Sequence, residues 1–131
     1  MATKLLTLRL GTNDVARARA FYDATFGILG IQAAPVPDQY PVAMYKLPDG
    51  LTFMLGAARD GNPATHANGG TIVFGADSEA QVSAWHAAGL ANGGTCEGPP
   101  EHKAVAQGAF GAYMRDPDGN KLAAYCNLKL G

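Results

Sequence analysis

The feature that most constrains this chain is an internal repeat. Residues 7–30 align without a gap on residues 71–94, at an offset of 64. A Pro-Asp-Gly turn follows in each copy, at 48–50 and 117–119, so the second copy carries about five more residues before its turn. Such self-similarity indicates that each copy forms one supersecondary unit. We therefore predict one domain over residues 1–131, built from units 1–56 and 69–128 with a connector over 57–68. The connector lies in the stretch GAARDGNPATHANGG, which is rich in Gly, Ala, Asn and Pro.

Each unit has a legible order of elements. An alternating strand comes first, and a helix follows good capping residues at 12–14 in the first copy and at Ser78 in the second. Gly89 is a plausible stop for the second helix. Later strands are expected at 31–34, 42–46 and 51–55, and at 94–97, 110–115 and 121–126. The pattern predicts an α+β fold of two tandem βαβββ units, with the core helix residues Phe21, Phe26, Leu29, Val82, Trp85 and Leu90.

Composition excludes several classes of function. Apolar residues make up 47% of the 131, which is typical of a globular chain, and no apolar stretch is long enough to span a membrane. The net charge of −1 leaves no basic surface for nucleic acid. The two cysteines, Cys96 and Cys126, fit neither a disulfide framework nor a zinc motif, and we interpret both as packing residues. The N-terminus reads as a strand, not a targeting segment, so we expect a cytoplasmic protein.

Three stretches carry a resemblance to a known family: LGTNDVARARAFYDATFGILG, GNPATHANGGTIVFGA and MRDPDGNKLAAYC. Together with the doubled unit they resemble the vicinal oxygen chelate family, which includes glyoxalases, extradiol dioxygenases and bleomycin-binding proteins. The resemblance covers nearly the whole chain. It implies mixed sheets that curl into an open cup, helices on the outer face, and a homodimer as the usual state. One fold hosts many chemistries, so the resemblance alone does not name an activity.

In metal-dependent members of that family, a first-strand His or Gln and a last-strand Glu from each unit bind a divalent metal. The corresponding positions here are Thr7, Met54, Thr71 and Ala123. Threonine hydroxyls are weak ligands without carboxylates, the methionine thioether suits Cu(I), and alanine offers nothing. The mapping therefore predicts no metal site and no cofactor. A shift of the register by one residue brings up no better ligand.

The alternation that places Thr7 in the cup places Arg9 beside it, and Lys121 and Tyr125 flank Ala123. Arg9 is either an anion-binding group or an arginine paired with a carboxylate or with water. Tyr45 and Tyr113 either stack on a flat ligand or are packing residues of their strands. The methionines Met44, Met54 and Met114 either line the cup or belong to the core.

The histidines form no metal motif. His66 is expected in the connector and His86 on the surface of the second helix. His102 lies in the loop GPPEHKAVAQG, where a ligand-contacting or acid–base role competes with that of a plain loop residue.

Two main readings of function remain. The first is a family member without the metal ligands that binds a small organic molecule, with an anionic group near Arg9 and Lys121. The predicted ligand-binding set is Thr7, Arg9, Met54, Thr71, His102, Tyr113, Lys121, Ala123 and Tyr125. The second is a metal-independent lyase or isomerase that uses His102, Tyr113 or Tyr125 as acid–base groups. A metalloenzyme with misread ligands is a third, and bound metal would single it out. A cup formed within one chain and one shared across a dimer both remain open.

Overall fold

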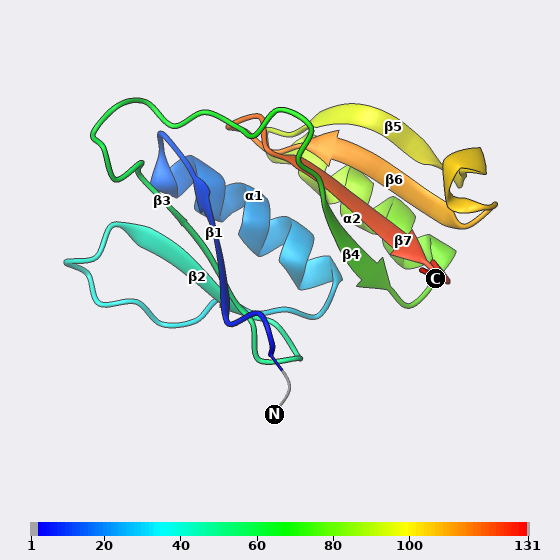
Figure 1. The fold of residues 1–131 in the computed structure, drawn as a ribbon, viewed down its shortest axis with the longest axis horizontal. Helices are drawn as coiled ribbons and strands as arrows, with labels where there is room; N and C mark the ends of the chain where they lie inside the picture. The colour runs from blue at the N-terminus through cyan, green and yellow to red at the C-terminus, as the bar shows by residue number, and fades with distance from the viewer. Residues whose placement is uncertain (1–2, 131) are drawn as a thin grey trace.

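The computed structural model describes residues 3–130 and contains two similar units (Figure 1). The first consists of β1 (Thr7–Gly11), α1 (Val15–Ile28), β2 (Val42–Lys46) and β3 (Thr52–Gly56). The second consists of β4 (Ile72–Ala76), α2 (Glu79–Ala91), β5 (Thr95–His102), the short 3-10 helix η1 (Ala104–Ala106), β6 (Phe110–Arg115) and β7 (Lys121–Cys126). No helix within 3–130 has the length and apolar character that crossing a membrane requires.

Two mixed sheets result, with strand orders β1-β3-β2 and β4-β7-β6-β5. In each sheet the first strand of the unit runs parallel to the last, so the predicted α+β fold is confirmed. The strand expected at 31–34 is reduced to a single bridge between Ala33 and Tyr45. Prolines at 35, 37 and 41 follow it, and proline cannot donate a ladder hydrogen bond. The first sheet therefore has three strands and the second has four.

Both helices begin at the expected caps. The Asp14 side chain accepts a hydrogen bond from the Arg17 backbone amide, and the Ser78 side chain accepts one from that of Gln81. The helices pack against each other and cover one side of each sheet. Aromatic rings connect the units, because Phe26 lies edge-on to Phe53 of β3 at 5.1 Å and to Phe74 of β4 at 5.3 Å. The two halves therefore share one core.

Three predictions about α2 are wrong for the same reason. His86 is 7% exposed and Leu90 is 42% exposed, the reverse of what we expected. Gly89 does not end the helix, which continues to Ala91; it lies so close to Met114 that any β-carbon would collide with that side chain. The buried face of α2 therefore runs through Val82, Trp85, His86 and Gly89. Leu90 follows this face by one residue and turns away from it.

Candidate functional site

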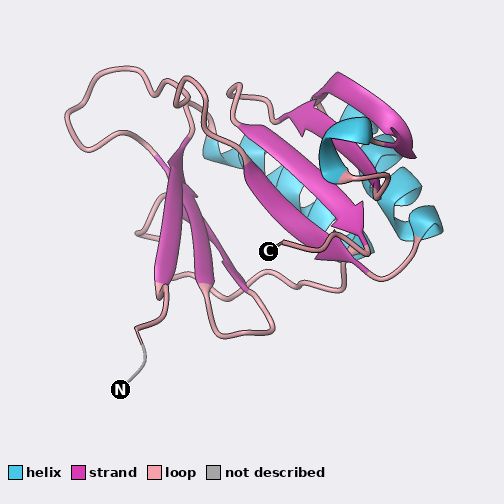
Figure 2. Ribbon diagram, turned by 45° about the vertical axis from the view of Figure 1, so that its right-hand side comes forward, coloured by secondary structure: helices cyan, strands magenta, loops and turns pink. Residues whose placement is uncertain are grey.

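The open faces of the two sheets, away from the helices, carry most of the predicted ligand-binding residues. Leu8 and Leu10 of β1 pack against the core, so the alternation of the strand turns Thr7 and Arg9 to the open side. The sheets splay apart and do not close (Figure 2). The same alternation holds for β3, β4, β6 and β7, and it places on the open faces Met54, Val73, Tyr113, Lys121, Ala123 and Tyr125.

A crevice of about 320 Å³ brings residues of both sheets together. Arg9 of β1 lies on one side of it, and Thr71 and Lys121 of the second unit lie on the other. Its remaining lining comes from Leu8, Leu10, Ala67, Gly70, Ile72 and Asn120. The lining thus contains two cationic side chains and no carboxylate, so the crevice has a positive character.

Arg9 keeps part of its hydrogen-bonding capacity open. Its guanidinium lies across Gly56, which has no side chain to obstruct it, and Nη2 donates to the backbone oxygen of Ala57 at 2.9 Å. Within residues 3–130 no carboxylate forms an ion pair with it. The sequence left two interpretations of Arg9 open. The described residues contain no carboxylate that pairs with it. Arginine presents five donors in a fork, so several remain to receive an anion.

A pair of tyrosines occupies the open face of the second sheet. The hydroxyls of Tyr113 and Tyr125 lie 2.7 Å apart, and their rings meet edge to face. Burial, followed by the hydrogen bond to Tyr113, raises the pKa of Tyr125 above its ordinary value. The ammonium groups of Lys121 and Lys103 lie 5.4 and 5.9 Å from the centre of the Tyr113 ring. The raised pKa therefore keeps Tyr125 protonated in a positively charged setting.

The four positions that hold a metal elsewhere in the family do not form a ligand set here. Thr7 lies opposite Thr52, while Met54 lies opposite Arg9, whose charge would repel a cation. Ala123 is fully buried, between Val73 and Tyr113 in the register of the sheet. Across residues 3–130 no three His, Cys, Asp or Glu side chains come together as a potential metal site. The donors present do not fit the divalent metals of the family.

His102 lies apart from the crevice and from the tyrosines. Its ring packs edge-on against Phe110, its Nδ1 lies 2.8 Å from the Gly108 oxygen, and its Nε2 lies 3.7 Å from a Glu79 oxygen of α2. The neighbouring Lys103 is the residue of that loop that approaches Tyr113. Sequence reasoning passed over Lys103 because an isolated lysine in a loop gives no periodic signal.

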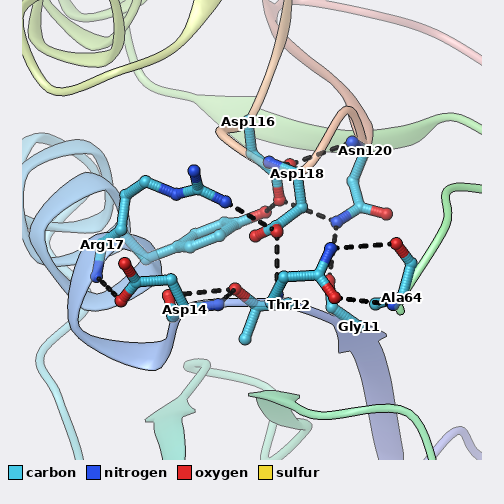
Figure 3. A network of polar contacts seen from close by, with 10 residues as sticks. Gly11, Thr12, Asp14, Arg17, Ala64, Asp116, Asp118 and Asn120 are labelled. Carbon is cyan, nitrogen blue, oxygen red and sulfur yellow. Dashed lines mark hydrogen bonds and ion pairs between the residues drawn. The ribbon is translucent and has the colours of Figure 1, made fainter. Parts of the chain in front are cut away.

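A network of hydrogen bonds joins the units beside the crevice (Figure 3). We call it the turn network; it consists of Asp116, Asp118 and Asn120 with their partners Gly11, Asn13, Arg17, Tyr22 and Ala64. Asn120 Nδ2 donates to the Gly11 oxygen at 3.3 Å, which ties the start of β7 to the end of β1. Lys121 follows Asn120 directly and Arg9 lies two residues before Gly11, so this bond helps to hold the two cationic residues of the crevice near each other.

Comparisons with known proteins agree with this architecture. The family model for the Glyoxalase/Bleomycin resistance protein/Dioxygenase superfamily matches residues 4–124. The crystal structure of a glyoxalase/bleomycin resistance protein from Albidiferax ferrireducens T118 is similar, with 41% identity and a TM-score of 0.82, and the match covers 94% of this chain and 98% of that one.

More distant structures show the fold alone. A glyoxalase-related enzyme from Fulvimarina pelagi has 20% identity and a TM-score of 0.77, over 96% of this chain and 89% of its own. A lactoylglutathione lyase from Agrobacterium tumefaciens has 22% identity and a TM-score of 0.64, over 96% and 95%. No curated protein matches the chain. The family match over nearly the whole length is decisive, and the chain therefore belongs to the glyoxalase/bleomycin resistance protein/dioxygenase superfamily.

Proposed function

We propose that this protein binds a small organic anion between its two sheets and does so without a metal at the family's ligand positions. The observation that carries the proposal is the crevice in which Arg9 and Lys121, from different units, face one space with no carboxylate in its lining. An arginine fork and a nearby ammonium favour a carboxylate or phosphate group. The similar protein from Albidiferax ferrireducens T118 is described as a glyoxalase/bleomycin resistance protein, which is compatible with a binding role.

The other predicted residues have defined parts in this proposal. Thr71 lines the crevice and offers a hydroxyl to the anion, while Thr7 and Met54 continue the open face of the first sheet. Tyr113, Tyr125 and the buried Ala123 continue the open face of the second. His102 is not part of the crevice, so we assign it no contact with the anion.

The test is a titration of isotope-labelled protein with succinate, followed by nuclear magnetic resonance. We expect saturable shifts of the amide signals of Thr71 and Lys121, and weaker binding at higher ionic strength. Arg9→Ala should weaken succinate binding about tenfold, the size of one charge-assisted hydrogen bond. Arg19→Ala is the matched control, because Arg19 lies on α1 and donates to the Val42 oxygen, away from the crevice.

Equal affinities in Arg9→Ala and in the unaltered protein would contradict the anion assignment. Stoichiometric retention of Zn²⁺, Ni²⁺, Mn²⁺ or Fe²⁺ after desalting, measured by elemental analysis, would contradict the metal-independent part.

A second candidate function is a metal-independent lyase or isomerase, and the tyrosine pair favours it. Because burial and the hydrogen bond to Tyr113 raise the pKa of Tyr125, this hydroxyl keeps its proton near neutral pH and can act as a proton donor but not as a base. In that case Tyr125→Phe would abolish turnover of a substrate while leaving succinate affinity at the crevice unchanged. Turnover that survives this substitution would exclude the pair as the acid.

We also propose that the protein is a cytoplasmic homodimer, as expected from the family resemblance. Analytical ultracentrifugation of the purified protein tests the dimer, and a monomer at all concentrations would contradict it.

A further inference from the structure

We infer that a second hollow, on the open face of the second sheet, binds the ring of a phenol, with the phenolic oxygen at the Tyr113–Tyr125 pair. This inference rests on the proposed function, because it gives chemical detail to the organic part of the ligand. The compartment, here called the tyrosine pocket, has a volume of about 330 Å³. The residues that matter for the argument are Val73, Val105, Tyr113, Tyr125, Leu128 and Leu130, all of which line it.

Two reversals of the backbone build the tyrosine pocket. Asn127 has a φ of 58°, so the chain turns directly after β7 (Figure 2), and Leu128 and Leu130 line the pocket. Gln107 has a φ of 56° after η1, and Val105 lines the pocket from that side. Gly111 lies directly under the Tyr125 ring and would collide with it if it carried a β-carbon. The glycine therefore lets the ring lie low on the sheet and form a floor.

The walls of this pocket are apolar and unusually open. Val105 is 87% exposed, Leu130 is 86% exposed and Val73 is 46% exposed. Isolated exposed apolar side chains are ordinary, but three that line one hollow indicate a ligand surface. A volume near 330 Å³ is at the small end of ligand pockets, which suits a single substituted ring.

The tyrosine pair offers few hydrogen-bonding groups to a ligand. When two hydroxyls share one hydrogen bond, one of them donates and the other keeps its proton for a further acceptor. The Tyr113–Tyr125 pair therefore offers one O–H to a ligand. A single phenolic oxygen uses that donor. The second oxygen of a carboxylate has no fixed donor here, because the other polar side chains of the lining, Gln107 and Lys129, are exposed. The geometry thus favours one oxygen on an apolar ring.

The charges around the pair favour an ionised oxygen. Lys103 is already committed, since its ammonium donates to the Pro99 oxygen at 2.7 Å and to Glu101 at 2.9 Å. It acts on the pocket through its field and not through contact. Lys121 lies closer to the Tyr113 ring, and the nearby Glu97 is neutralised by its ion pair with Arg115. Both lysines therefore attract the oxygen of a bound phenol.

The probe for this inference is 4-nitrophenol, whose absorption reports its ionisation. We expect saturable binding to the full chain, followed by the absorption of the phenol. Val73→Phe should fill the pocket and reduce the affinity at least tenfold. The double variant Tyr113→Phe with Tyr125→Phe keeps the shape but removes both hydroxyls, and a further tenfold loss corresponds to one hydrogen bond to a charged group.

Matched controls exist for both variants. Leu90→Phe enlarges an exposed apolar residue on α2, and Tyr40→Phe removes a hydroxyl from an exposed tyrosine of the first unit. Both should bind 4-nitrophenol as the unaltered protein does. Circular dichroism establishes that Val73→Phe is folded, and the double variant tests the inference independently of that substitution.

Three results would overturn the inference: no saturable binding of 4-nitrophenol, binding unchanged by Val73→Phe and by the double variant, or benzoate that binds to the tyrosine pocket as tightly as the phenol. Its failure is separable from that of the proposed function. Succinate that binds at Arg9 while 4-nitrophenol does not bind leaves the crevice assignment intact. If 4-nitrophenol binds and succinate does not, the assignment of the tyrosine pocket stands and that of the crevice is wrong.

Discussion

The two Pro-Asp-Gly turns are alike in sequence and opposite in their connections. In the first, between β2 and β3, Asp49 accepts a hydrogen bond from the amide of Leu51, and the other bonds of the turn are equally local. In the second, between β6 and β7, the Asp116 carboxylate accepts four hydrogen bonds, one of them from Tyr22 of the other unit at 2.6 Å. The first turn is exposed, whereas Asp116 is only 3% exposed.

The difference comes from the residues that flank the shared motif. Where the second turn has Asp116 and Asn120, the first has Leu47 and Leu51. Leucines can pack but cannot accept or donate, so the first turn only reverses the chain. A turn of identical local chemistry becomes a junction between units when its neighbours carry polar groups that reach across.

The largest effect should come from Asp116→Ala. We expect the free energy of unfolding to fall by about 3–5 kcal/mol, because a buried carboxylate with several partners is removed and those partners lose theirs. Urea denaturation of the variant and of the unaltered protein measures this. A loss below about 1 kcal/mol would mean that water replaces the carboxylate and that the two turns differ less than the contacts indicate.

Tyr22→Phe should cost less, about 1–2 kcal/mol, since it removes one hydrogen bond to a charged group and leaves the ring packing intact. Tyr45→Phe is the matched control: it is equally buried, but its hydroxyl donates to Asp23, which lies at the surface within the same unit. The same denaturation experiment compares them. Equal losses in the free energy of unfolding would show that the hydrogen bond between the units contributes no more than the one within a unit.

Asp118→Ala and Asp49→Ala compare the turns at equivalent positions. Asp118 accepts bonds from the Asn13 amide and from Arg17, so we expect a loss of about 1 kcal/mol. For Asp49→Ala the expected change is about 0.5 kcal/mol or less, as for other surface positions. Thermal unfolding followed by circular dichroism is sufficient here. A larger loss for Asp49→Ala would reverse the comparison.

The smallest effect concerns a second pair of equivalent positions, Tyr22 on α1 and His86 on α2. Both are buried polar groups, but His86 stays within its unit, with Nε2 3.2 Å from the thiol of Cys96. Burial, together with nearby Lys103, lowers the pKa of His86 below 6.5. As the pH falls, the unfolded chain therefore takes up a proton before the folded protein does. Stability is lost as the pH falls below the ordinary pKa of histidine.

Replacing His86 by leucine should reduce the decline in stability between about pH 7 and pH 5, since the titrating group is then absent. Urea midpoints across this range measure the slope. An unchanged slope would mean that other groups cause the acid sensitivity.

Much of the fold was predictable, because strand faces follow a period of two and need no long-range information. In β3, for example, Phe53 and Leu55 are buried while Thr52 and Met54 are only partly buried, as an alternating strand requires. His86 and Leu90 were misplaced because the buried face of α2 depends on how closely the helix approaches Met114 through Gly89. That approach is a matter of packing, which helical periodicity does not contain.

By itself, the sequence determined the duplication, the caps, the alternation of faces and the types of side chain at the family's metal positions. Each of these depends on local spacing or on residue identity alone. Only the tertiary structure decided that Arg9 faces Lys121, that Tyr113 meets Tyr125, and that Lys103 lies beside them. The physical reason is that these contacts depend on how strands and units separated by many residues are placed. That placement is set by a shared aromatic core and by the turn network, whose bonds join residues more than 90 positions apart.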